Sequence, residues 1–273
     1  MPGVDLEAVG VITGWGEGLD ALPGDATGAC AGSASLVIER PPLDGERFRR
    51  ATRECLLGVS AVRALLAKSG RSAPEIAGGA TALLYVTATA YGASNRAFVE
   101  APTAGALYFP YTAPSAVSAE VAIEFQLTGP YAIFVGGATA TIEALAHGAR
   151  LCERGECERA LVLAVETFRE CEDLHARTRW LLGRPLVEAA ACALLGPGTG
   201  RLRVADAAAP SHLARDARRR AGETLACEPL IALALGLESG DDRLHVTGDW
   251  RGRRLGLEWA LPHPASSTMG AQV

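Results

Sequence analysis

The sequence predicts an α/β fold in which a mostly parallel sheet is covered by helices on both faces. Three observations predict it. Apolar segments of strand length alternate with amphipathic segments of helical spacing. The strand segments are apolar throughout, as expected for strands that are buried on both faces. Glycine and proline mark most boundaries between segments.

The first half of the chain is expected to alternate strand and helix. Its helices place apolar residues at helical spacing, and Gly70 ends the first of them. The expected elements are a strand at 8–14, a helix at 45–69, a strand at 81–88, a loop at 101–114, a helix at 115–127 and a strand at 131–137.

The second half continues this alternation and then changes in character. After residue 208 the pattern favours one long helix followed by a β-hairpin, with Trp250, Arg251 and Gly252 near its turn. The expected elements are a helix at 139–154, strands at 159–166, 187–196 and 201–207, a helix at 211–238, hairpin strands at 243–249 and 253–261, and a tail at 263–273 without periodicity.

Composition excludes several classes of protein. The 273 residues are 49% hydrophobic and 21% charged, so the chain as a whole is not disordered. No apolar run is long enough to span a membrane, no secretory signal is evident, and we expect a cytoplasmic protein. The net charge of −5 argues against a general nucleic-acid binder. Lys68 is the only lysine.

The sequence predicts no metal or cofactor. Seven cysteines are scattered, and the spacer between Cys152 and Cys157 does not fit a zinc knuckle. Residues 14–18 read G-x-G-x-G, which is not the dinucleotide spacing, and Trp15 stands where a pyrophosphate would approach the backbone. We interpret this segment as a tight turn after the first strand.

Other polar residues form no recognisable catalytic set. His147 falls in a helix, His245 in a hairpin strand and His263 in the tail, and no serine or cysteine elbow of the G-x-S-x-G kind accompanies them. The Arg218–Arg220 run is interpreted as a solvated helix face.

Residues 110–166 carry a resemblance to a known family. A helix, a Gly129-Pro130 turn, an apolar strand and an elbow of small residues lead into a helix that ends in Arg154-Gly155-Glu156-Cys157. This order resembles the centre of the β-ketoacyl-acyl-carrier-protein synthases of the thiolase-like superfamily, and the resemblance extends to about Ala207. It implies a thiolase-like layered α-β-α fold with a complete N-terminal half at 1–207 and a second half, 208–273, reduced to a helix and a hairpin.

The chain departs from this family at the reactive position. The resemblance places the elbow at Gly136, Gly137, Ala138 and Thr139, with Ala138 where the family carries its nucleophilic cysteine. A methyl group cannot attack a thioester, so no catalytic residue is predicted. No lysine follows the elbow, and His245-Val246-Thr247-Gly248-Asp249 only faintly matches the family's first histidine motif.

The resemblance also implies a partner. Family members are dimers in which the strand before the elbow pairs with its counterpart. Here that strand comprises Tyr131, Ala132, Ile133, Phe134 and Val135. From the residues alone, an apolar strand of this kind fits a central strand of its own sheet equally well.

Relatives without the cysteine include chain-length factors, which pair with a cysteine-bearing ketosynthase and limit the acyl tunnel. Short forms of this kind resemble partners in aryl-polyene pathways. The resemblance implies tunnel walls at 91–100 and 107–111, and the aromatic rings among them are Tyr91, Phe98, Tyr108, Phe109 and Tyr111.

The expected function is thus that of a non-catalytic subunit in a heterodimer, with an acyl carrier protein as an indirect partner. Two alternatives stay open. The first is a diverged acyltransferase or decarboxylase that depends on Thr139 or His245. The second is a module that binds an acyl group or a carrier protein.

Overall fold

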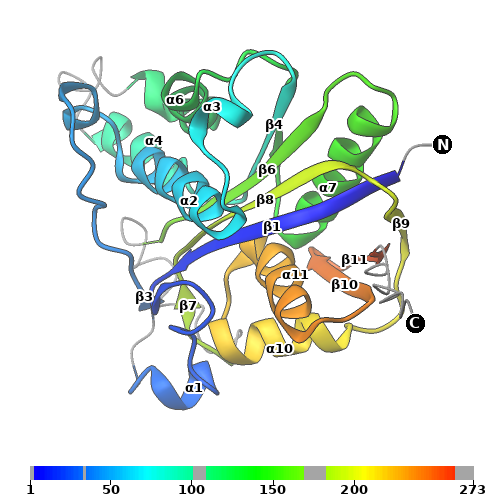
Figure 1. The fold of residues 1–273 in the computed structure, drawn as a ribbon. Helices are drawn as coiled ribbons and strands as arrows, with labels where there is room; N and C mark the ends of the chain where they lie inside the picture. The colour runs from blue at the N-terminus through cyan, green and yellow to red at the C-terminus, as the bar shows by residue number, and fades with distance from the viewer. Residues whose placement is uncertain (1–2, 33–34, 101–108, 169–182, 262–273) are drawn as a thin grey trace, which may run out of the picture.

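A six-stranded sheet forms the centre of the molecule (Figure 1). The computed structural model describes residues 3–32, 35–100, 109–168 and 183–261. The strands lie in the order β2-β1-β8-β6-β4-β5. Their bounds are β1 (Gly3–Thr13), β2 (Gly16–Glu17), β4 (Thr81–Thr87), β5 (Tyr131–Val135), β6 (Arg159–Glu166) and β8 (Ala189–Gly198).

Helices cover both faces of this sheet, as the sequence predicts (Figure 1). On one face, α2 (Arg53–Ser69) and α6 (Ser115–Phe125) bury their apolar residues in one core cluster. On the other face, α7 (Ala138–Glu153) and α11 (Glu228–Ser239) contribute to a second cluster. Strands β4, β6 and β8 supply residues to both clusters, which explains their uniformly apolar sequences.

A second, three-stranded sheet packs on the far side of α7. We call it the small sheet. It consists of β9 (Arg201–Asp206), β10 (Arg243–Trp250) and β11 (Arg253–Ala260), in the order β10-β11-β9. The predicted hairpin is confirmed, and Arg251 and Gly252 form its turn with positive φ angles of 49° and 81°. Because β9 pairs with β11, residues 201–206 belong to the same sheet as the hairpin. The predicted boundary between an N-terminal half at 1–207 and a reduced second half at 208–273 stays a proposal.

Shorter elements complete the described chain. The tight turn predicted at 14–18 is present, because β2 folds back on the end of β1. The remaining elements are α1 (Ala26–Ala29), β3 (Ser35–Leu36), η1 (Glu46–Arg49), α3 (Ala73–Ile76), α4 (Gly92–Glu100), η2 (Phe109–Thr112), β7 (Leu186–Val187), α10 (His212–Ala221) and η4 (Leu225–Cys227).

The main sheet is mixed rather than mostly parallel. Strands β4, β5 and β6 run parallel to one another, but β8 is antiparallel to both of its neighbours, β1 and β6. A strand buried on both faces has the same apolar sequence in either direction, so the pattern that predicts burial does not fix direction.

The single helix predicted at 211–238 is wrong, because the structure divides it into α10 and α11. Gly222 ends α10 with a φ of 89° and lies against Pro185, whose carbonyl oxygen would be 2.8 Å from a Cβ at this position. Pro229 then occupies the first turn of α11, where the missing N–H costs no helical hydrogen bond.

The helix predicted at 45–69 is also interrupted. Residues 46–49 form the 3-10 helix η1, and α2 begins only at Arg53, after Thr52 in an extended conformation. The guanidinium of Arg40 donates to the carbonyl oxygens of Phe48 and Ala51, each at 2.9 Å. These bonds satisfy carbonyl groups that a continuous helix would use within itself.

Candidate functional site

The elbow, Gly136–Thr139, lies where β5 ends and α7 begins. The Gly136 N–H donates to the carbonyl of Thr87, at 2.9 Å, which fixes the end of β5 against β4. Gly137 is the N-cap residue, and Ala138 is the first residue of α7. The Ala138 side chain is only 2% exposed, so its methyl group faces protein and not an open cleft.

The end of β10 covers the elbow. A Cβ added to Gly248 would lie 2.6 Å from the carbonyl carbon and oxygen of Ala138, and a Cβ on Gly137 would lie 2.2 Å from a ring carbon of Trp250. Real atoms do not approach so closely, so the backbone of β10 and the indole ring rest directly on the start of α7. Ala138, where the resemblance predicts the family's nucleophile, is therefore covered by the small sheet.

The structure separates the two residues of the enzyme alternative. Thr139 lies buried in the first turn of α7. His245 is exposed on β10, three residues before Gly248, and side chains alternate between the faces of a strand. Because Gly248 faces Ala138, His245 points away from the elbow. Thr139 and His245 thus do not form a nucleophile and base pair.

Glu166 is a buried carboxylate that the sequence reasoning missed. It ends β6 and is fully buried. It accepts from the N–H groups of Ala88 at 2.7 Å, Thr89 at 3.0 Å and Ala226 at 3.3 Å, and from the Thr89 hydroxyl at 2.6 Å. Loss of hydration raises the pKa of Glu166 to about 7, although the hydrogen-bond donors lower it. The sequence signal that indicates this site is an acidic residue, Glu166, at the end of the otherwise apolar strand 160–166.

We expect Glu166 to make stability depend on pH. Between about pH 4.5 and 7 the unfolded chain ionises this carboxyl while the folded chain retains the proton. The free energy of unfolding should therefore fall as pH rises, by up to about 3 kcal/mol from this group. Glu228, whose pKa is also raised by burial to about 7, acts with the same sign.

Urea unfolding at pH 5 and pH 8 measures this effect. Glu166→Gln does not titrate and should lose about half of the pH slope. Glu258→Gln, an exposed change on β11, should keep the full slope. An unaltered slope in Glu166→Gln would show that Glu166 is already ionised at pH 5.

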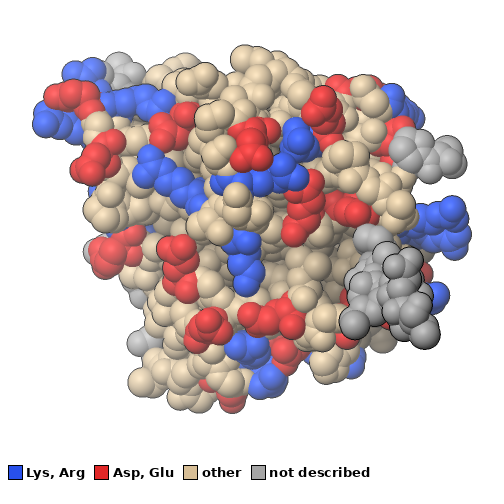
Figure 2. Space-filling model, in the orientation of Figure 1, with Lys and Arg blue, Asp and Glu red and all other residues tan. Residues whose placement is uncertain are grey.

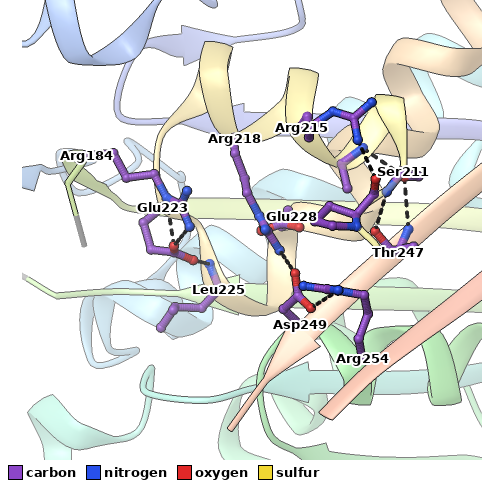
Figure 3. Close-up of polar contacts among 12 residues, drawn as sticks. Arg184, Ser211, Arg215, Arg218, Glu223, Leu225, Glu228, Thr247, Asp249 and Arg254 are labelled. Atoms are coloured by element: carbon purple, nitrogen blue, oxygen red, sulfur yellow. Dashed lines mark hydrogen bonds and ion pairs between the residues drawn. The ribbon is translucent and has the colours of Figure 1, made fainter. Parts of the chain in front are cut away.

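A buried ion network holds the small sheet over the elbow (Figure 3). Arg218 of α10 donates to Glu228 at 2.6 Å and to Asp249 of β10 at 2.7 Å, and Arg254 pairs with the same Asp249. The two arginines lower the pKa of Asp249 despite its partial burial. Asp249 lies between Gly248 and Trp250, so this network fixes the residues that cover α7.

The network also corrects the interpretation of Arg218–Arg220 as a solvated face for Arg218 and Arg220, whereas Arg219 is exposed as predicted. The Arg218 side chain is only 15% exposed, and Arg219 and Arg220 donate to the carbonyl oxygens of Gly24 and Leu19. Two further contacts lie nearby in Figure 3. Arg184 pairs with Glu223 at 2.6 Å, and the Ser211 N–H donates to Thr247 at 2.9 Å.

The predicted interface strand lies at an edge of the main sheet. Only β4 pairs with β5 among the described residues, so the other edge of β5 is open. Tyr131 and Val135, at its two ends, are 71% and 59% exposed. Ala132 and Phe134 pack toward α7, and Ile133 packs toward α2 and α6.

The open edge offers backbone as well as apolar surface. The carbonyl of Pro130 and the N–H of Gly136 bond to β4. By the two-residue period of a strand, the N–H groups of Tyr131, Ile133 and Val135 point outward. A hollow of about 350 Å³ between α6 and Tyr131 adjoins this edge.

The rings predicted to wall a tunnel lie on α4, on η2 and beside them. Phe98 and Phe109 pack with ring centroids 5.7 Å apart, and Phe109 is 63% exposed. Tyr91 and Tyr111 are half-buried, and Tyr111 packs against the α2 side of the core. Tyr108 lies outside the described residues.

Comparison with known proteins identifies the family. The family model for the N-terminal domain of β-ketoacyl synthase matches residues 40–186, which is more than half of the chain. The chain belongs to the β-ketoacyl synthase family. None of the curated proteins matches this ketosynthase-like chain.

Solved structures share the whole fold at low sequence identity. The ishigamide ketosynthase/chain length factor has a TM-score of 0.70 and 16% identity, over 96% of this chain and 100% of the other. The ketosynthase ApeO in complex with its chain length factor ApeC, from Xenorhabdus doucetiae, gives 0.64 and 13%, over 94% and 99%. AntDE:AntF, a type II acyl-carrier protein in complex with its ketosynthase, gives 0.72 and 14%, over 96% and 100%. These matches confirm the predicted thiolase-like fold.

None of the helices described is both long enough and apolar enough to cross a membrane. No group of three or more His, Cys, Asp or Glu side chains is placed to hold a metal ion in the described part of the chain.

Proposed function

We propose that this chain is a non-catalytic ketosynthase-like subunit that forms a heterodimer with a cysteine-bearing ketosynthase. The observation that carries the proposal is the elbow. Its first helical residue is Ala138, which has no nucleophilic atom, and the backbone of Gly248 and the ring of Trp250 cover it. A substrate carbonyl at this position would meet no nucleophile, and the covering residues would block its approach.

The open edge of β5 supports the heterodimer. An apolar edge strand with outward N–H groups is a template for pairing with another chain. Continuing the sheet into a partner would cover Tyr131 and Val135 and satisfy the free backbone groups of β5. A second copy of this chain would have the same edge, but such a pair would hold no catalytic cysteine at either elbow.

Turnover by the purified chain tests the proposal. We expect no malonyl-carrier condensation by the chain alone, and none by Ala138→Cys, because Gly248 leaves no space for substrate and His245 points away from the elbow. Co-expression with a ketosynthase encoded beside it should give a 1:1 complex by light scattering. Robust condensation by the isolated chain, or a monomer beside a ketosynthase that is active without it, would contradict the proposal.

The chain-length role gives a separate prediction. If the Phe98–Phe109 pair limits the acyl tunnel at the partner interface, Phe109→Ala should lengthen the products of the complex, because close-packed aromatic rings exclude acyl carbons. Mass spectrometry of carrier-bound products measures this. Val204→Ala, an exposed change on the small sheet, is the control. Unchanged products for both Phe98→Ala and Phe109→Ala would leave only a scaffolding role.

The finer features of the proposal rest on the resemblance to short partner subunits. We propose a role in a polyene pathway such as an aryl-polyene pathway and a cytoplasmic location. We also propose that an acyl carrier protein reaches the complex through the ketosynthase. The alternative of a diverged acyltransferase or decarboxylase predicts activity of the isolated chain that depends on Thr139, in α7, or on His245, in β10. A module that binds acyl groups or carrier protein alone predicts affinity for a carrier protein without any ketosynthase.

A further inference from the structure

One outer surface of the molecule is rich in arginine. The side of the small sheet that faces away from α7 presents Arg243 and His245 from β10 and Arg201 and Arg203 from β9. We call these four residues the basic face. The strand register places Arg243 and Arg201 on either side of Ala260, and His245 and Arg203 on either side of Glu258. All four side chains are exposed.

The arginines of the basic face differ from most others in the chain. Most described arginines are held by a carboxylate or a backbone carbonyl, as Arg218 is by Glu228. Arg201, Arg203 and Arg243 make no side-chain hydrogen bond or ion pair with the part of the chain that the structure describes. Outside this face, only Arg50 and Arg150 among the described arginines have neither a polar nor an aromatic partner.

Figure 2 agrees with this distribution. One group of Lys and Arg side chains lies at the right-hand edge, near β9, and another lies at the upper left of the view. A concentration of unpaired cations on a chain of net charge −5 creates a local positive potential that attracts acidic partners.

The basic face borders a hollow with an apolar side. A depression of about 900 Å³ lies between β9, the loop at 207–211 and His212 at the start of α10. Its loop side includes Ala207, Ala208, Ala209 and Pro210. Its sheet side includes Arg203, His245 and Gly256 together with the carboxylates of Asp206 and Glu258. A second hollow, of about 360 Å³, continues past Arg201 and Arg243. The surface is thus amphipathic, with three arginines and two carboxylates along its sheet side and small apolar groups along its loop side.

We propose that the basic face and the adjoining hollow form a docking surface for an acidic, amphipathic segment of another protein. Its carboxylates would pair with Arg201, Arg203 and Arg243, and its apolar side would rest on the alanine loop. Glu258, in the middle of the face, disfavours a nucleic acid, because it would repel the phosphate backbone but can pair with an occasional lysine of a protein segment. This surface is on the small sheet and does not depend on the proposed function at β5.

Fluorescence anisotropy with a labelled helical peptide of alternating Glu-Glu and Leu-Leu pairs tests the proposal on the full chain. We expect binding to weaken as NaCl is raised from about 50 to about 300 mM. Over this range the Debye length falls from roughly 14 to 6 Å, so attraction between exposed charges is screened. Arg201→Glu/Arg203→Glu/Arg243→Glu should reduce affinity by about tenfold or more. Arg50→Glu/Arg150→Glu reverses two unpaired arginines elsewhere and should leave affinity unchanged.

Each other outcome overturns the proposal. Absence of peptide binding, or equal loss of binding in both sets of variants, would show that the basic face is not a docking surface. Tighter binding of a single-stranded RNA oligonucleotide than of the peptide would assign the face to nucleic acid. If the triple variant does not fold, as judged by circular dichroism, Arg243→Glu alone is compared with Arg150→Glu, and equal affinity of the two contradicts the proposal.

Discussion

Replacing Val135 by Lys should prevent the chain from forming a stable complex with the proposed ketosynthase partner. Val135 is 59% exposed at the open edge of β5, and pairing with a partner strand would bury its side chain. A lysine there would bring an uncompensated charge into the interface, and natural edge strands use such charges to avoid pairing. We expect affinity to fall by about a hundredfold or more, which corresponds to about 3 kcal/mol.

Titration of purified subunits by calorimetry measures this loss. Val204→Lys changes another partly exposed valine on an edge strand, β9, and should leave the complex intact. Ile133→Pro removes one outward N–H and keeps the β5–β4 bonds, so it should also weaken the complex. Wild-type affinity in both β5 variants would place the ketosynthase on some other surface.

The apolar segments of the sequence predict most strands because burial on both faces requires them. Strands β4, β6 and β8 lie where expected for this reason. The same reasoning cannot place β5, since Tyr131–Val135 is as apolar as a central strand and yet stands at the edge. What distinguishes an edge strand is the absence of a neighbour, and no residue of the strand itself encodes that absence.

The closed elbow depends on contacts that sequence patterns do not contain. Gly137 and Gly248 are 111 positions apart, and each is a glycine because another part of the chain takes the space of its side chain. Local spacing predicts the hairpin but not what it packs against. Glu166 was missed for the same reason, because its donors at 88–89 and 226 come from distant segments.

Gly248→Ala should destabilise the folded chain by about 3 kcal/mol, the upper end of the usual cost of overpacking. The added Cβ would fall 2.6 Å from the backbone of Ala138, which belongs to the first turn of α7 and cannot rotate away. The hairpin would have to lift off the elbow and strain the contact of Arg218 with Asp249. A fall in melting temperature of about 6–12 °C measures this.

Two double variants distinguish a sealed elbow from general damage. Gly137→Ala also overpacks, but its Cβ meets the movable Trp250 ring at 2.2 Å, so Trp250→Ala should recover part of the loss in a double-mutant cycle. Ala138→Gly should recover little of the loss in Gly248→Ala, because the contacts at 2.6 Å are with backbone atoms. If Gly248→Ala melts like the wild type, β10 does not rest on α7, and the elbow is open to substrate.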